Sequence, residues 1–163
     1  MDFYYVEDDY IKYLRQYDQK VADNKHETRP YVGIVLTVNG IEYFAPFTSP
    51  KQKHLSMKND VDFRKINGGK LGAINLNNMI PVVPSALIKI TISAIADVKY
   101  RRLMQNQYNE IRKDSAFIQN SAIKLRSLIF ADDTKLSQHD LRIKSRCCDL
   151  ALLEKIYNQY QNR

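Results

Sequence analysis

The sequence of 163 residues has little of what marks disulfide-rich, collagen-like or disordered chains: two cysteines, five glycines and five prolines. Hydrophobic residues make up 44% and charged residues 26%, which is typical of a folded domain without low-complexity arrays. Because one domain usually spans roughly 100 to 200 residues, we expect a single domain over residues 1–163.

Long hydrophobic runs are absent as well. No window approaches the roughly 18 apolar residues of a membrane span, and residues 1–9 lack the basic start and apolar core of a signal peptide. Cys147 and Cys148 are adjacent on an expected helix, where a vicinal disulfide would be strained. These features predict a cytoplasmic protein without a membrane partner, whose cysteines are reduced core thiols.

The common motifs of metal and phosphate chemistry are also missing. The three histidines lie far apart and form no zinc-binding spacing, and neither a P-loop nor a dinucleotide-binding motif occurs. The carboxylate pairs Asp8-Asp9 and Asp132-Asp133 fall at expected helix ends, where capping explains them better than two-metal catalysis does. We therefore expect neither a metal ion nor a cofactor.

Positive charge is what the sequence has in excess. The formal net charge is +7, and the excess follows Asp97, with 13 Lys and Arg against 7 Asp and Glu. A basic protein attracts polyanions, of which nucleic acid is the commonest. Composition alone does not separate RNA from DNA or from an acidic protein.

Hydrophobic periodicity predicts strands in the first half of the chain and helices in the second. The clearest strand, 31–38, is followed by Asn39-Gly40, which favours a type I′ turn, and by a returning strand at 41–45. Further strands are expected at 3–6, 71–76 and 79–83, and residues 87–92 are expected to form another strand or a short buried segment. Helices are expected from Asp8 to near Lys20 and at 98–111, 115–131 and 145–160. This order predicts an α+β fold, a compact, strongly bent antiparallel sheet with several packed helices and a mainly helical C-terminal half.

The segment after this hairpin groups reactive side chains. We expect residues 46–54 to form a loop, because their prolines cannot continue the ladder. Within seven residues the loop offers two hydroxyls, two ammonium groups and an imidazole: Thr48, Ser49, Lys51, Lys53 and His54. RNA cleavage without metal needs such donors to neutralise phosphoryl charge, together with proton transfer at both oxygen ends. The alternative is an exposed polar loop that binds nothing.

Three segments in this order, 31–36, 43–51 and 71–82, resemble the type III toxin–antitoxin endoribonucleases of the ToxN/AbiQ family. The opening Phe3-Tyr4 with residues 10–14, and the helical residues 100–107 with Ile111-Arg112, match as well. The resemblance thus covers nearly the whole chain, and we expect a relative of the CptN type.

The resemblance implies a fold similar to MazF and Kid, with an SH3-like barrel and added helices. It implies RNA cleavage that leaves 2′,3′-cyclic phosphate and 5′-hydroxyl ends, with cellular or phage RNA as substrates. It also implies a repeat-containing antitoxin transcript that the toxin processes into pseudoknots. These RNAs inhibit the toxin in a closed RNA–protein assembly, and many such systems act against phage by abortive infection.

By position, the resemblance places catalysis on Thr48, Ser49 and Lys51, and a basic residue before the hairpin on Arg29. An arginine there suits phosphate clamping, because it does not titrate near neutrality. Lys53 and His54 are expected to contact phosphate or transfer a proton, and the alternative for His54 is a solvated loop histidine. Cations and rings expected to bind RNA elsewhere are Tyr31, Lys65, Lys99, Tyr100, Arg101 and Arg102.

Two other functions remain open at this level. A non-catalytic RNA-binding module would use the same basic face and loop without cutting, and a metal-dependent DNA nuclease would lose its cleavage in EDTA. Most of the 11 tyrosines are expected to be half-buried packing residues rather than base-stacking platforms.

Overall fold

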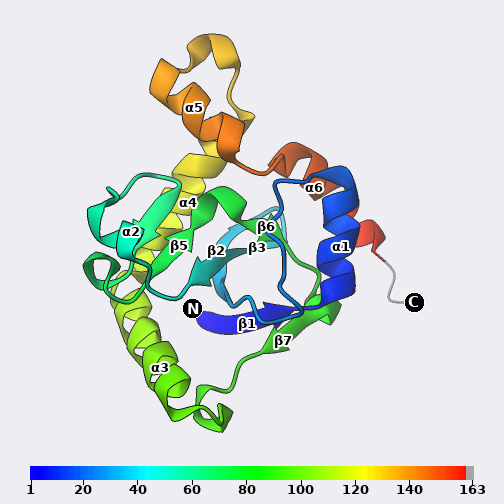
Figure 1. Cartoon of the computed structure of the whole chain (residues 1–163). Coiled ribbons are helices and arrows are strands. Elements are labelled where there is room, and N and C mark those ends of the chain that lie inside the picture. Colours follow the sequence, from blue (N-terminus) through cyan, green and yellow to red (C-terminus); the bar gives the residue numbers. More distant parts are fainter. Residues whose placement is uncertain (161–163) are drawn as a thin grey trace.

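The computed structural model describes residues 1–160. Its centre is a seven-stranded antiparallel sheet in the order β4-β5-β3-β2-β1-β7, with β6 also paired to β3 (Figure 1). The strands are β1 (Asp2–Val6), β2 (Tyr31–Val38), β3 (Ile41–Thr48), β4 (Phe63–Lys65), β5 (Ala73–Asn75), β6 (Ile80–Pro81) and β7 (Leu87–Lys89). Within residues 1–160 no pairing joins β4 to β7, so the sheet is open and the closed barrel is not formed. The predicted α+β fold with an antiparallel sheet is confirmed.

The β2–β3 hairpin forms as predicted, with positive φ angles of 51° at Asn39 and 79° at Gly40. The predicted end of the second strand is wrong, because β3 runs on through Pro46 to Thr48. Phe47 donates to Pro30 O at 3.0 Å, so the pair of Tyr31 and Pro46 is a non-hydrogen-bonded one. The nitrogen of Pro46 therefore points away from β2, to the edge where β3 changes partner from β6 to β5.

Two short elements were not predicted from the sequence. The strand β4 pairs with β5 in a small hairpin whose turn holds Gly68 at a φ of 64°. The expected loop after β3 contains the helix α2 (Gln52–Ser56). The later strands lie where they were predicted but are shorter, with three residues in β5, two in β6 and three in β7.

The remaining helices are α1 (Asp8–Tyr17), α3 (Val98–Lys113), α4 (Ser115–Phe130), α5 (Gln138–Arg146) and α6 (Leu150–Ile156). The mainly helical C-terminal half is thus confirmed. A single helix over 145–160 is wrong, because the chain breaks between α5 and α6. At this break Asp149 caps α6 by accepting from Leu152 N at 3.0 Å. At the other end of α5, Ser137 caps that helix by accepting from Asp140 N at 3.1 Å.

The helices surround one hydrophobic core. Helix α4 packs against β2, α6 packs against β6 and α1, and α5 projects from one end of the molecule (Figure 1). Cys147 and Cys148 are buried free thiols as predicted, although they follow α5 instead of lying within a helix. Burial raises the pKa of each thiol to about 12. Among residues 1–160, no helix combines the length and apolarity needed to cross a membrane.

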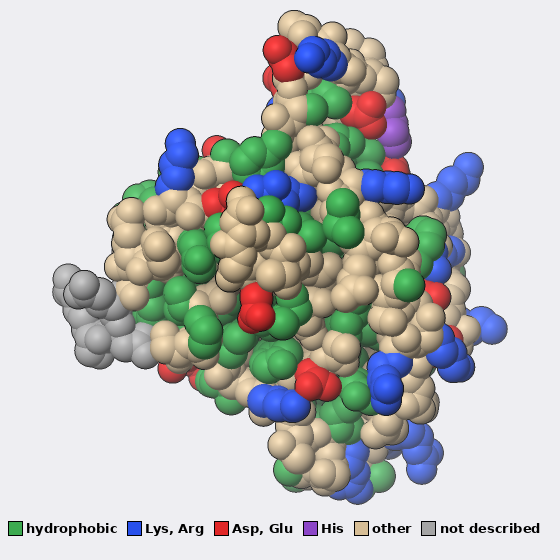
Figure 2. Space-filling view, turned by 180° about the vertical axis from the view of Figure 1, so that it is seen from behind, with side chains coloured by type: hydrophobic (Ala, Val, Ile, Leu, Met, Phe, Trp, Pro, Cys, Tyr) green, Lys and Arg blue, Asp and Glu red, His purple; other side chains and the backbone are tan. Residues whose placement is uncertain are grey.

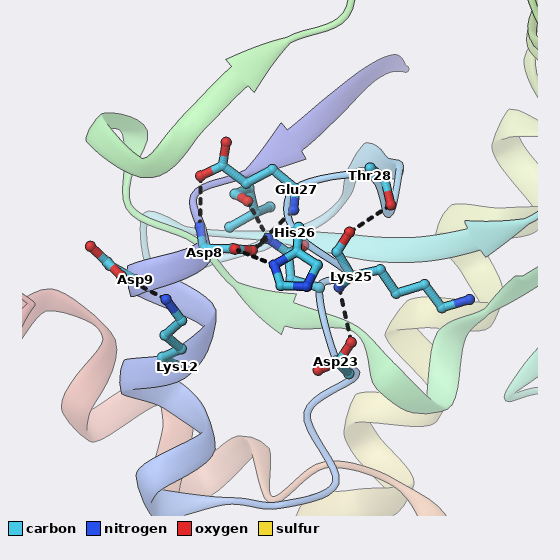
Figure 3. A network of polar contacts seen from close by, with 10 residues as sticks. Asp8, Asp9, Lys12, Asp23, Lys25, His26, Glu27 and Thr28 are labelled. Carbon is cyan, nitrogen blue, oxygen red and sulfur yellow. Dashed lines mark hydrogen bonds and ion pairs between the residues drawn. The ribbon is translucent and has the colours of Figure 1, made fainter.

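The loop between α1 and β2 is fastened to the start of α1 (Figure 3). Asp8 N donates to the Glu27 carboxylate and Glu27 N donates to the Asp8 carboxylate, each at 3.0 Å. Asn24 adds a bond to the same carboxylate at 2.7 Å, and Lys25, His26 and Glu27 adopt positive φ angles. The predicted capping of α1 by Asp8 is therefore wrong, because the Asp8 carboxylate binds this loop and no side chain within residues 1–160 caps the helix.

Candidate active site

The candidate catalytic segment runs from the end of β3 into α2. Thr48 is the last residue of β3 and pairs with Ala73 of β5. Lys51 precedes the first turn of α2, which closes when His54 N donates to Lys51 O at 2.9 Å. The His54 ring completes this turn, because its Nδ1 accepts from Lys51 N at 3.2 Å. The segment is therefore an ordered strand-to-helix connection.

Two glycines of the β4–β5 hairpin lie directly against this segment. A Cβ at Gly72 would lie 1.9 Å from Thr48 O, and one at Gly69 would lie 2.4 Å from His54 O. Both glycines also have positive φ, 105° and 93°. Only glycine combines that backbone conformation with so close an approach, so the hairpin fits tightly around both ends of the segment.

A buried glutamine holds the same segment from the other side. Gln107 of α3 is 1% exposed, and its Nε2 donates to Leu71 O at 2.7 Å and to Thr48 O at 3.3 Å. It occupies a core position between Met104 and Ile111 on the buried face of the helix. A polar residue at that apolar position was the signal that could have identified it from the sequence.

The segment opens into a cavity of about 400 Å³. Its lining combines cations, carboxylates and amides, while Met57 and Phe63 supply apolar surface. The lining residues are Thr48, Lys51, Lys53, His54, Met57, Lys58, Asp60, Asp62, Phe63, Asn75, Asn77 and Arg146. A cavity of this size with few convergent polar groups is typical of a ligand site.

His54 is buried, not solvated, so the interpretation as a free loop histidine is wrong. Its side chain is covered by the segment and by the β4–β5 hairpin, which leaves the residue 3% exposed. Burial lowers the pKa of His54, and the positive charges of Lys51 and Lys53 lower it further. Since Nδ1 accepts a hydrogen bond, the neutral ring carries its proton on Nε2.

The cavity brings together four of the predicted site residues, Thr48, Lys51, Lys53 and His54. The Thr48 hydroxyl is buried and has no hydrogen-bond partner within residues 1–160. Ser49 is exposed next to Thr48 but does not line the cavity.

Arg29 does not reach this cavity. Its Nε donates to Asp23 O, and its backbone nitrogen donates to Asn24 O at 3.3 Å, both within the loop that precedes β2. Its guanidinium therefore fastens the loop in this structure. The prediction that Arg29 clamps the scissile phosphate finds no supporting contact here.

The residues predicted to bind RNA elsewhere differ in how exposed their side chains are. Tyr31 is fully buried, because both faces of β2 are covered, so its ring cannot stack on a base and that prediction is wrong. Arg101 donates to Ile95 O at 2.8 Å, and Tyr100 is half-buried. Lys99 and Arg102 are exposed on α3, and seen from behind, cations gather along the edge that carries α2 and α3 (Figure 2). The ammonium of the half-buried Lys65 donates to Leu55 O of α2 at 3.3 Å.

Several residues that line the cavity were not predicted from the sequence. Arg146, from the end of α5, binds the buried Asp62 through Nε and Nη2, the latter at 2.8 Å from Oδ1. Asn75 and Asn77 come from the end of β5 and the turn after it, and they stand out as polar residues in an apolar stretch. No group of three or more His, Cys, Asp or Glu within residues 1–160 is arranged to hold a metal ion.

The chain is similar to known proteins over almost its whole length. Residues 2–158 match the family described as "Toxin ToxN, type III toxin-antitoxin system". The chain is 33% identical to Endoribonuclease ToxN of Bacillus thuringiensis subsp. kurstaki, with 99% of this chain and 84% of that protein covered. It is 30% identical to Endoribonuclease ToxN of Pectobacterium atrosepticum, with 98% and 94% covered.

Among solved structures, one described as a type III system with "selective toxin inhibition by a non-coding RNA pseudoknot" superposes with a TM-score of 0.86. It is 32% identical, and 99% of this chain and 98% of that chain are covered. By sequence and by structure, the chain belongs to the ToxN family of type III toxin–antitoxin endoribonucleases.

Proposed function

We propose that this chain cleaves RNA without a metal ion, by attack of a ribose 2′-hydroxyl on the neighbouring phosphorus. The products are a 2′,3′-cyclic phosphate and a 5′-hydroxyl end. The observation that supports this mechanism is the cavity wall on which Thr48, Lys51, Lys53 and His54 converge. Cationic and neutral donors there face the space that a phosphate would occupy, and such preorganised donors are the main source of catalysis when charge develops on oxygen.

Each side chain has a role suited to its environment. The ammonium of Lys51 neutralises the charge that grows on the phosphoryl oxygens, and Lys53 adds a second cation at the mouth. The unpaired Thr48 hydroxyl donates to a phosphoryl oxygen after rotation about χ1. This new hydrogen bond removes the free-energy cost of leaving a buried polar group unbonded. Ser49 orients the 2′-hydroxyl from the rim.

His54 acts as a neutral donor in this proposal. Its Nδ1 is engaged by Lys51 N, so the proton on Nε2 is the one available to an oxygen of the substrate. The lowered pKa of His54 keeps the ring neutral near pH 7. The same hydrogen bond joins the ring to the backbone of Lys51, so the orientation of the His54 ring relative to the Lys51 main chain is fixed.

We further propose that a structured RNA, processed from a repeat transcript, fills this cavity and keeps the enzyme silent in a closed RNA–protein assembly. The cationic edge along α2 and α3 supports an extended RNA contact. One similar structure is described as "A processed non-coding RNA regulates a bacterial antiviral system", with 29% identity and a TM-score of 0.81. Defence against phage by abortive infection is the cellular role that follows.

The test is incubation of purified protein with single-stranded RNA in EDTA. We expect new fragments whose 5′-hydroxyl ends accept phosphate from polynucleotide kinase without prior phosphatase treatment. The Lys51→Ala variant is expected to lose at least about a hundredfold in rate. The matched control, Lys70→Ala, removes an exposed cation outside the cavity and should cut normally.

The other outcomes identify the competing functions. Cleavage that disappears in EDTA and returns with magnesium would identify a metal-dependent nuclease. RNA that is bound but stays intact would identify a binding module. Ser49→Ala is expected to slow cleavage with little change in RNA affinity, and a fully active variant would remove Ser49 from the mechanism.

A further inference from the structure

The cavity also carries groups that phosphate chemistry does not need. Besides the reactive side chains from β3 and α2, its lining includes the amides of Asn75 and Asn77, the carboxylate of Asp60 and the Arg146–Asp62 pair. A phosphate would occupy only part of a space of about 400 Å³. The rest is therefore available to whatever is attached to that phosphate.

The backbone of Asn77 is fixed while its amide is free to bind. Asn77 N donates to Asp62 O, and Asn77 O accepts from Cys148 N, both at 3.0 Å. Asn75 is likewise held in the ladder, opposite Phe63. Within residues 1–160, neither amide has a hydrogen-bond partner, whereas the amide of neighbouring Asn78 is engaged with Lys20 O at 2.8 Å.

One of the two carboxylates beside these amides is paired with a cation. Asp62 is 2% exposed and binds Arg146 through both of its oxygens. Asp60 accepts from Val61 N at 2.7 Å and lies 3.0 Å from His139 Nε2, a contact that is an ion pair only when the imidazole is protonated. The outer N–H groups of the Arg146 guanidinium remain available as donors.

The cavity also has an apolar surface. Phe63 and Met57 line the cavity, and the Phe63 ring centre lies 6.1 Å from that of His54. An apolar wall with amides that each offer a donor beside an acceptor fits the edge of a nucleobase, because proteins read unstacked RNA bases by such edge contacts.

We propose that Asn75 and Asn77 read the nucleobase next to the scissile phosphate, and so set the sequence that this enzyme cuts. The inference rests on the proposed cleavage site, since it places the phosphate at the Lys51 end. A base that fills the amide end brings its own phosphate to the cationic wall. Recognition and alignment for cleavage are then one event.

The test uses two variants, Asn75→Leu and Asn77→Leu, on short RNAs that vary at the positions around one cut. Wild type is expected to prefer one base at a position next to the cut, and each variant to lose about tenfold at preferred RNAs, with less than twofold change at the others. Asn78→Leu, whose amide donates to Lys20 O and does not line the cavity, serves as the control and should keep the preference. Equal losses on every RNA, or an unchanged preference, would overturn the proposal.

Binding provides a second readout that does not require cleavage. The Lys51→Ala variant is expected to bind the same RNAs with a base preference, and the Lys51→Ala, Asn77→Leu double variant to bind them all alike. If wild type cuts nothing, the cleavage mechanism fails, but a base preference lost in the double variant still supports the reading site. An identical preference in both variants refutes it.

Discussion

The side-chain amide of Gln107 joins two backbone carbonyl oxygens, Leu71 O and Thr48 O, that lie 2.7 and 3.3 Å from its Nε2. One residue of α3 thus sets the spacing between the end of β3 and the start of β5. In this way, the helix that carries the exposed Lys99 and Arg102 also holds the candidate active site.

Replacing Gln107 by leucine should therefore damage both the fold and the site. Two partly buried carbonyl oxygens lose this donor, and we expect a loss of about 1–3 kcal/mol in the free energy of unfolding. At temperatures where the variant stays folded, the cleavage rate at saturating RNA should fall at least about tenfold. Urea unfolding and single-turnover cleavage measure the two effects, and Gln105→Leu, exposed on the same helix, should show neither.

Gly72→Ala is expected to be far more harmful than a glycine substitution in an open turn. Its Cβ would lie 1.9 Å from Thr48 O at a φ of 105°, so the active-site backbone must move. Gly40 also has a positive φ but has no atom within 4 Å, and Gly40→Ala should cost only about 1 kcal/mol. Equal unfolding midpoints for the two variants would contradict the close approach.

Stability should depend on pH through His54. Burial, then Lys51 and Lys53, lowers its folded-state pKa below the unfolded value near 6.5. The unfolded chain therefore takes up a proton first, and the contribution of the neutral ring, fully present above pH of about 6.5, is lost as the pH falls towards the folded-state value. His54→Asn should flatten the fall in melting temperature between pH of about 7.5 and 5.5. An equal fall in the variant and in the wild type would contradict this dependence.

Arg102→Ala tests the predicted RNA contact on α3. This exposed guanidinium should contribute one phosphate contact, so its loss should weaken binding similarly for all RNA sequences and reduce the salt slope by about one. The rate at saturating RNA should stay at the wild-type level. A variant whose binding keeps the same dependence on salt would place the RNA elsewhere.

Elements with local signals could be predicted from the sequence. The Asn39-Gly40 turn and the period of α3 and α4 belong to residues adjacent in the chain. A five-residue helix such as α2 and a three-residue strand such as β4 are too short for a periodic signal. Their stability comes from distant contacts, such as the close approach of Gly69 to His54 O.

In the candidate site too, residues close together in the sequence could be predicted and residues brought in by distant contacts could not. Thr48, Lys51, Lys53 and His54 could be identified as a group because they are neighbours in sequence. Arg146 reaches the cavity only through the projecting helix α5, which periodicity did not predict at all. The burial of Tyr31 could not be predicted, because it depends on tertiary packing: groups distant in the sequence, such as Cys148, lie near its side chain.

The close approach of Gly72 to Thr48 O also predicts which mutations can inactivate this protein. Every amino-acid change that a single base substitution makes in a glycine codon introduces a Cβ. At Gly72, all these missense alleles push on the carbonyl oxygen beside the cavity, whatever the chemistry of the new side chain. Strains that survive the loss of their antitoxin should therefore carry escape mutations in this hairpin, and not only in codons for the reactive side chains.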